Sequence, residues 1–151
     1  MDRIDRKILA LLQQDGRLSN AALAEKVGIS TTACWNHMRR LMEAGYIQGI
    51  HAVLDPDQIG LPLLVTVGVV LDRSTPDSFK AFETAVLDLP VIQECLLLAG
   101  EFDYWLKIRV RDTPSFNRLH ARVLLSLPGV RQLRTFFVLQ EVKHSRLLPL
   151  E

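Results

Sequence analysis

The stretch NAALAEKVGISTTACWNHMRRLMEAGYI, residues 20–47, predicts a short helix, a tight turn and a longer helix. Ala24 is small enough to let a second helix cross closely, and Gly28 permits the turn. Ser30 is expected to cap the longer helix, because its hydroxyl can accept a hydrogen bond from a backbone N–H that has no partner inside the helix. This pattern is typical of a helix-turn-helix, whose second helix projects outward to read DNA.

The outward face of the longer helix carries side chains that suit DNA. At about 100° per residue it lies opposite the apolar stripe of Cys34, Met38 and Leu41. Asparagine pairs with adenine, arginine binds guanine or phosphate, and threonine hydroxyls bind either. The predicted DNA-binding residues are Ser30, Thr31, Thr32, Asn36, His37, Arg39 and Arg40.

Two alternatives stand beside this interpretation. Arg39 and Arg40 also fit a solvated helix face on which Glu43 is an ion-pair partner, since amphipathic basic helices are common. His37 lies between the two faces, where it either reaches phosphate or is a surface residue without a partner. The turn chemistry that precedes the helix favours DNA binding over the solvated face.

Composition and charge limit the function classes. The chain has 151 residues and is 48% hydrophobic, which suits two small domains with separate cores. Its 18 Lys and Arg nearly balance 17 Asp and Glu, for a net charge of +1, so DNA binding has to depend on local charge. One domain should therefore bind weakly, and a dimer or higher oligomer is needed for useful occupancy.

No targeting or membrane-spanning segment is visible. The longest apolar runs, 61–71 and 95–99, are too short to span a bilayer. Cys34 and Cys95 lie far apart without CxxC spacing, which argues against a disulfide scaffold or a zinc site and suits a reducing cytosol. We therefore expect a soluble, cytoplasmic protein without a bound metal or cofactor.

The rest of the chain predicts an α+β fold in three parts. A first helix over 5–14 completes a three-helix, winged-helix-like DNA-binding domain at 1–50, and an extended strand and linker follow at 51–62. Residues 63–151 have the order βαββαβ, with strands at 63–71, 92–98, 104–110 and 133–142. Such a ferredoxin-like unit has both helices on one face of its sheet. A second copy would cover the other face, so we expect a homodimer.

The turn between the second and third strands is a candidate ligand site. Asp103 can take the ammonium group of an amino acid, while backbone N–H groups near Gly100 take its carboxylate. The alternative is a polar hairpin turn with an exposed aspartate, because Gly and Asp are ordinary turn residues. The candidate effector-binding residues, drawn from this turn, the second helix and the last strand, are Leu98, Ala99, Gly100, Glu101, Phe102, Asp103, Tyr104, Arg118, Arg122, Thr135, Phe136 and Phe137.

Seven separate motifs resemble the Lrp/AsnC family, the leucine-responsive and asparagine-responsive regulators of bacteria and archaea. They span nearly the whole chain: Asp5-Arg6-Lys7-Ile8-Leu9, Asp15-Gly16-Arg17, Leu23-Ala24-Glu25-Lys26-Val27-Gly28, Arg40-Leu41 with Gly45-Tyr46-Ile47, Gly100-Glu101-Phe102-Asp103-Tyr104, Leu127-Pro128-Gly129-Val130 and Glu141-Val142-Lys143. The resemblance implies an N-terminal DNA-binding domain and a C-terminal domain that senses ligands. It also implies dimers that assemble into octamers, an amino acid bound at the Gly-x-x-Asp-Tyr turn, and association with the nucleoid.

The chain also departs from the family pattern. The family often has Ser-Pro-x-Pro-Cys and then a basic pair at the start of the recognition helix, where this chain has Ser30-Thr31-Thr32-Ala33-Cys34 and then Asn36-His37. Trp35 and the terminal residues 148–151 are similar to a branch that includes cysteine-responsive regulators, whereas residues 92–95 are similar to the leucine-responsive branch. The effector therefore stays open at this point.

Three function classes compete. The four histidines form no catalytic pattern with Ser, Cys or carboxylates, and no phosphate-binding glycine loop is present, so an enzyme is not expected. The favoured function is a sequence-specific transcriptional regulator whose assembly or DNA affinity responds to an amino acid. The alternatives are an architectural DNA-binding protein and an amino-acid sensor without ligand-controlled transcription.

Overall fold

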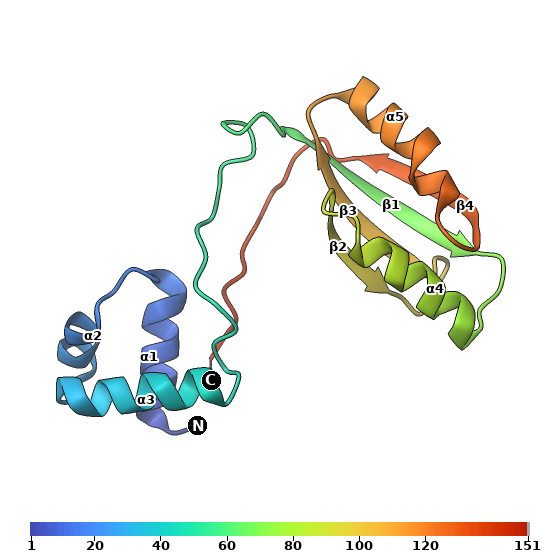
Figure 1. Ribbon diagram of the computed structural model, residues 1–151. Helices are drawn as coiled ribbons and strands as arrows, with labels where there is room; N and C mark the ends of the chain where they lie inside the picture. Colours follow the sequence, from blue (N-terminus) through green and yellow to red (C-terminus); the bar gives the residue numbers. More distant parts are fainter. Residues whose placement is uncertain (151) are drawn as a thin grey trace. The chain divides into compact units, whose positions relative to one another are not determined.

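A computed structural model describes residues 1–150 and divides the chain into two compact units (Figure 1). The first unit comprises Met1–Val53 together with the C-terminal segment that begins at Lys143, and the second comprises Leu54–Val142. Each unit has its own hydrophobic cluster. None of the helices in the described part of the chain has both the length and the apolar content that crossing a membrane requires.

Three helices form the first unit: α1 (Arg3–Gln14), α2 (Asn20–Val27) and α3 (Thr31–Glu43). The Ser19 and Ser30 hydroxyls cap α2 and α3 by accepting hydrogen bonds from backbone N–H groups three residues later. Gly28 ends α2 with a φ of 80°, a left-handed conformation that favours glycine. Ile8, Leu23, Cys34 and Leu41 are buried between the helices, and Met38 of the same stripe packs against them partly buried. The predicted helix-turn-helix is confirmed.

The C-terminal segment belongs to the first unit, although the sequence assigned it to the second domain. The side-chain amide of Gln13 donates to the Leu148 carbonyl at 3.0 Å, and the Leu148 N–H donates to Gln13 Oε1 at 2.6 Å. Leu150 packs against the core of the three helices. Nothing in a short apolar tail specifies a partner more than a hundred residues away, so this placement was not predictable from local pattern. Glu151 lies outside the described residues.

The strand predicted at the start of residues 51–62 does not form within the described protomer. Residues 48–55 have neither helical nor strand structure, and the next residues form a turn that ends at Gly60. A strand requires a hydrogen-bonded neighbour, and no segment of the described chain forms a ladder with this one. The segment is a linker throughout.

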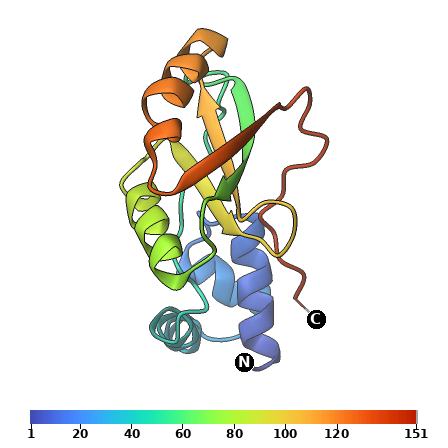
Figure 2. The same cartoon turned by 90° about the vertical axis from the view of Figure 1, so that its right-hand side faces the viewer.

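The second unit has the predicted βαββαβ order. Its elements are β1 (Leu63–Leu71), α4 (Pro76–Leu87), β2 (Ile92–Leu97), β3 (Tyr104–Val110), α5 (Thr113–Arg122), a 3-10 turn (Leu124–Ser126) and β4 (Val130–Phe137). The strands form an antiparallel sheet in the order β2-β3-β1-β4. Figure 2 shows α4 and α5 on the same face of this sheet. The last strand lies earlier in the chain than predicted, because pairing with β1 begins at Val130.

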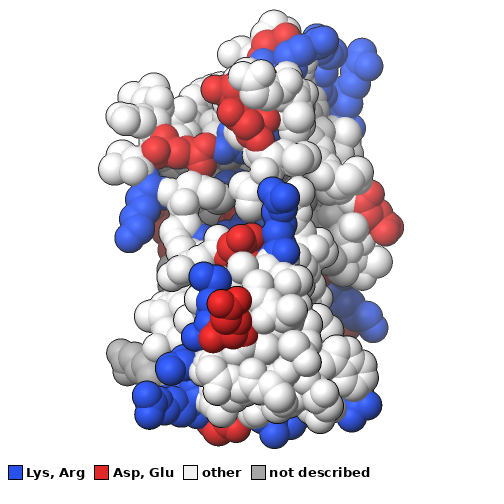
Figure 3. Space-filling view, turned by 90° about the vertical axis from the view of Figure 1, so that its left-hand side faces the viewer, with Lys and Arg blue, Asp and Glu red and all other residues white. Residues whose placement is uncertain are grey.

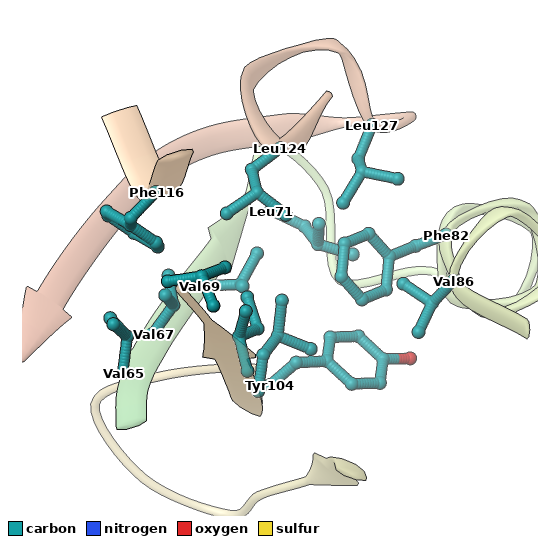
Figure 4. Close-up of a cluster of buried hydrophobic side chains, with 13 residues drawn as sticks. Val65, Val67, Val69, Leu71, Phe82, Val86, Tyr104, Phe116, Leu124 and Leu127 are labelled. Carbon is teal, nitrogen blue, oxygen red and sulfur yellow. The ribbon is translucent and has the colours of Figure 1, made fainter. Parts of the chain in front are cut away.

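The core of the second unit lies between the sheet and its two helices. Val65, Val67 and Val69 alternate along β1 and point toward the helices, where they meet Phe82 and Phe116 (Figure 4). The intervening β1 residues therefore face the opposite side of the sheet, away from α4 and α5. We call this side the open face; its residues include Gly68 and, on the neighbouring strands, Leu96, Trp105 and Phe136.

Candidate nucleic-acid interface and ligand turn

The outward face of α3 presents a compact set of polar side chains. Thr32, Asn36 and Arg39 are exposed there. The Arg39 guanidinium carbon lies 4.9 Å from the ring centroid of Trp35, and Arg39 Nε lies 3.8 Å from Glu43 Oε1. The cation–π contact and the loose ion pair each add little free energy on an exposed helix, and the Arg39 side chain stays 56% exposed. Sequence reasoning did not assign Trp35 this supporting role.

His37 and Arg40 behave differently from the rest of the predicted DNA-binding set. His37 Nδ1 lies 2.7 Å from Asp5 Oδ1, so of the two alternatives for His37 the surface residue without a partner is wrong. The Nη2 group of Arg40 donates to both carboxylate oxygens of Asp5, at 2.8 and 2.9 Å. Both side chains therefore connect α3 to α1 within the first unit. No local pattern indicates these pairs, because the partners lie 32 and 35 positions apart in the chain.

The pKa of Asp5 reflects these contacts. Burial alone would raise the pKa of this carboxyl, but hydrogen bonds from His37, the Asp2 backbone N–H and Arg40 outweigh it and lower the pKa to about 2. The same carboxylate raises the pKa of Arg40 above its usual value. Asp5 is therefore ionised at neutral pH and holds two α3 side chains at once.

The group of Asp2, Asp5 and His37 also has the spacing of metal ligands, with its ligand atoms within 4.8 Å of one another. The Arg40 guanidinium already contacts both carboxylates of this group, at 2.8 Å from Asp5 and 3.4 Å from Asp2. A cation at this place would have to displace that positive charge. The cluster is therefore an ion-pair network.

The predicted ligand turn joins β2 to β3. Asp103 is partly buried, and its Oδ2 accepts a hydrogen bond of 2.7 Å from the Leu71 backbone N–H at the end of β1. The Asp103 N–H donates to the Val69 carbonyl, and the Leu98 N–H donates to the Asp103 carbonyl. These bonds fix the carboxylate where β1 ends and β3 begins, at one end of the two central strands. Within the described residues its Oδ1 makes no hydrogen bond, so one oxygen is available to a ligand.

The structure brings only part of the candidate effector set together within one chain. The Phe102 ring lies beside Phe136, with centroids 6.4 Å apart, on the open face. Thr135 and Phe137 pair with the core-facing residues of β1 and so lie on the helix side of the sheet. Tyr104 is also buried there, and its hydroxyl donates to Glu83 Oε1 at 2.7 Å.

The two arginines of α5 lie apart from the turn. Arg118 Nη2 donates to Ser115 Oγ, at 3.0 Å, on its own helix. Arg122 occupies the last turn of α5, where a cation favours the negative end of the helix dipole. Among the described residues no hydrogen bond joins either arginine to residues 98–104. A single protomer therefore does not complete the predicted site.

An aromatic cluster of Phe102, Trp105 and Phe136 covers part of the open face beside the turn. Trp105 stacks on Phe136 at 5.4 Å, and Phe102 lies over Gly68 of β1. A Cβ atom at Gly68 would come within 2.6 Å of the Phe102 ring, so any other residue at this position would force the ring to move. The Glu101–Arg134 ion pair lies beside the cluster, with the Arg134 guanidinium over Phe102.

Comparison with known proteins agrees with both halves of this description. Residues 1–48 match the winged helix-turn-helix DNA-binding family, and residues 64–148 match the Lrp/AsnC ligand binding domain. The chain belongs to the Lrp/AsnC family of transcriptional regulators. This Lrp/AsnC protein therefore combines a DNA-binding helix-turn-helix with a ligand-binding domain, and family members are regulators, not enzymes.

Similar proteins are known from several bacteria. The leucine-responsive regulatory protein of Escherichia coli is 49% identical over 148 residues, which cover 98% of this chain and 90% of that protein. The crystal structure of a Neisseria meningitidis transcriptional regulator in complex with L-methionine is 35% identical, with a TM-score of 0.93 and coverage of 99% and 97%. An AsnC family regulator from Agrobacterium tumefaciens is 33% identical, with the same TM-score and coverage.

The charge distribution of this Lrp/AsnC protein is mixed. On the side shown in Figure 3, basic and acidic side chains of the described residues alternate with uncharged areas, and no single basic patch dominates. This agrees with the near balance of 18 basic and 17 acidic residues. Non-specific attraction to the phosphate backbone is therefore modest.

Proposed function

We propose that this regulator binds double-stranded DNA through the exposed face of α3 and that a bound amino acid changes its assembly or its DNA affinity. The observation that carries the DNA assignment is the exposure of Thr32, Asn36 and Arg39 on a capped helix whose opposite face is buried. Serine, threonine, asparagine and arginine together provide both base and phosphate contacts. The proposed DNA-binding residues are Ser30, Thr31, Thr32, Asn36 and Arg39, with residues 1–50 as the domain and 51–62 as the linker.

Substitution tests the DNA assignment. Duplexes selected by the wild-type protein from a random-sequence pool serve as the probe. Asn36→Ala should relax preference at one base position and cost about 1–3 kcal/mol of binding free energy. Arg39→Gln should weaken binding to all sequences and reduce the salt slope by about 1. Arg73→Gln, the same charge change on an exposed position of the second unit, is the control. Unchanged DNA binding in both α3 variants would refute the assignment.

We further propose an amino-acid effector with a neutral apolar side chain, bound at the turn 98–103. Support comes from the free Oδ1 of Asp103, which suits an ammonium group, and from the leucine-responsive and methionine-bound relatives. Gly100 adds a second argument. Its φ is not left-handed and a Cβ there would meet nothing within 4 Å, so the fold of the chain does not require glycine. Close approach of a ligand or of another protomer would require it.

A second protomer is the proposed source of the missing half of the site. The open face leaves Leu96 and Phe136 about half exposed, at 51% and 44%, which a homodimer would bury. Association of dimers into an octamer would bring α5 and β4 residues of one copy to the turn of another. We propose this assembly in the bacterial or archaeal cytoplasm, in association with the nucleoid.

Thermal unfolding in the presence of each of the twenty amino acids tests the effector. A ligand that binds only the folded state raises the unfolding free energy by about 2.7 kcal/mol at one hundred times its Kd. Asp103→Asn keeps an oxygen for the Leu71 N–H but removes the charge, so it should abolish the shift while DNA binding in the absence of ligand persists. A screen without any shift would favour an architectural DNA-binding protein. A shift that leaves DNA binding unaltered would favour a sensor without ligand-controlled transcription.

A further inference from the structure

Asp5 is the one buried charged side chain among residues 1–150, with 2% of its surface exposed. It lies on α1, yet both of its side-chain partners lie on α3. A buried carboxylate is costly unless it is paired and hydrogen-bonded, and removing one partner of such a pair leaves an uncompensated charge. The packing of α3 against α1 is therefore coupled to this group.

The geometry of the cluster assigns each group a role. His37 Nδ1 lies 2.7 Å from Asp5 Oδ1 and 3.1 Å from Arg40 Nη2. Because the ionised Asp5 carboxylate can only accept, the Nδ1–H group of His37 is the donor in the hydrogen bond to Asp5. Arg40 Nη2 donates to both oxygens, and the Asp2 N–H donates to Oδ2 at 2.9 Å. Asp5 is thus held by donors from its own helix start and from two successive turns of α3.

The same two turns carry the DNA-facing residues. Asn36 and Arg39 each precede a member of the cluster by one residue, so they point about 100° around the helix from His37 and Arg40. Rotation of α3 about its axis would break the Asp5 contacts and would move Asn36 and Arg39 away from the groove. The cluster of Asp5, His37 and Arg40 therefore fixes the direction in which the DNA-facing side chains of α3, Asn36 and Arg39, point.

We propose that Asp5, His37 and Arg40 are positioning residues for the recognition helix, and that His37 and Arg40 act on DNA through Asp5 and not by touching it. This inference rests on the proposed DNA-binding role of α3. Arg40 is 58% exposed, so direct contact between its guanidinium and phosphate is the competing possibility. The two possibilities differ in salt dependence, because only a phosphate contact releases a counterion.

The first test compares two arginines one residue apart on the same helix. Arg40→Gln and Arg39→Gln are made in the full chain and titrated with selected duplexes at several salt concentrations. Arg39→Gln should reduce the slope of log affinity against log salt by about 1. Arg40→Gln should leave the slope unchanged and lower the DNA affinity by about tenfold. That is the loss expected when one base-contacting side chain of α3 no longer reaches its base. A slope reduced equally by both substitutions would overturn the inference.

The second test is a double-mutant cycle with Asp5→Asn, which preserves the shape of the side chain. If Arg40 acts through Asp5, Arg40→Gln should change DNA affinity by less than about twofold in the Asp5→Asn background. Equal losses in both backgrounds would show that Arg40 contacts DNA independently. Should the double variant fail to fold, the salt slope of Arg40→Gln alone still decides between the two outcomes.

A conservative substitution tests His37. Asn at position 37 keeps an N–H near the place of Nδ1, whereas Ala removes it. His37→Asn should retain most of the DNA affinity that His37→Ala loses, and equal losses would assign His37 to the DNA interface.

The double-mutant cycle of Asp5→Asn and Arg40→Gln is also measured by unfolding without DNA. If the two losses of unfolding free energy are additive, the positioning role of Asp5 and Arg40 is refuted and the proposed DNA-binding role of α3 is untouched. If they are coupled but Arg39→Gln and Asn36→Ala leave DNA binding unaffected, the proposed role of α3 is refuted instead.

Discussion

At the scale of single residues, Asp5 makes the free energy of unfolding depend on pH in the acidic range. Its folded pKa of about 2 lies below the usual 3.8, so the unfolded chain takes up a proton more readily between these values. Stability from Asp5 is therefore fully present above about pH 4 and is lost as the pH falls toward 2. Asp5→Asn should lower the free energy of unfolding by about 2 kcal/mol at pH 7 and flatten its decline between pH 4 and 2.

Denaturant unfolding of the first unit at pH 7, 4 and 3 measures this effect. Glu25→Gln is a matched control, because Glu25 is an exposed carboxylate on α2 of the same unit. It should change the free energy of unfolding by no more than about 0.5 kcal/mol at each pH. An acid dependence that Asp5→Asn shares unchanged with the wild type would contradict the assignment.

Substitution by alanine should destabilise the second unit at Gly68 and leave its stability almost unchanged at Gly100. Gly68→Ala places a Cβ within 2.6 Å of the Phe102 ring, so Phe102 has to leave its position and the free energy of unfolding should fall by about 1–3 kcal/mol. Gly100→Ala meets no atom within 4 Å and should leave the stability of the protomer within about 0.5 kcal/mol of the wild type. The same Gly100 variant should lose its amino-acid response.

Thermal unfolding with and without the effector measures both substitutions. A stable Gly100→Ala protein that still responds to the effector would show that neither a ligand nor a second protomer approaches this position closely. Loss of stability in Gly100→Ala would instead indicate a contact within the second unit.

The residues of the site were only partly predictable. The strand period of two already places Thr135 and Phe137 on one face and Phe136 on the other, so one strand of one chain cannot present all three to the same ligand. The pairing of Asp5 with His37 and Arg40 has no such local rule. It depends on which helix faces cross, and that is a property of the folded first unit.

At the scale of elements, the caps of α2 and α3 allow a matched comparison. Ser19 Oγ and Ser30 Oγ each accept a backbone hydrogen bond of 3.1 Å at the first turn of their helices. Ser19→Ala and Ser30→Ala should therefore lower the free energy of unfolding by similar amounts, about 1 kcal/mol each. Only Ser30→Ala loosens the first turn of the reading helix, so its DNA affinity should fall further than that of Ser19→Ala. Equal DNA affinities would place the start of α3 away from the DNA.

Elements with a strong local pattern were the predictable ones. Helical spacing, serine caps and the left-handed glycine at 28 define α2 and α3, and the alternation of β1 defines its buried side. The remaining elements were less predictable, because a strand forms only where a neighbouring strand pairs with it. The composition of residues 48–55 suits an extended strand, but no strand of the described chain pairs with them. The strand β4 begins at Val130 because its pairing with β1 begins there.

At the scale of the whole molecule, the open face would connect the proposed ligand turn to the proposed assembly. Phe102 belongs to the turn and also packs with Trp105 and Phe136 on that face. A ligand that moves the turn would therefore alter the surface offered to a second protomer. Linkage requires the converse as well: assembly that orders this surface should strengthen ligand binding by the same factor.

A charge on the open face should therefore dissociate the assembly and weaken DNA binding together. Phe136→Glu places an unpaired carboxylate within the surface that a homodimer would bury, and a buried unpaired charge costs several kcal/mol. Leu87→Glu is the control, because Leu87 is 85% exposed at the end of α4 on the helix side of the sheet. Sedimentation equilibrium should show monomers for Phe136→Glu and the wild-type assembly for Leu87→Glu. Since two linked half-sites bind with an affinity that neither reaches alone, the monomer should lose at least about a hundredfold in affinity for duplexes selected by the wild type. A monomer that binds those duplexes as tightly as the wild type would show that one copy of α3 is sufficient.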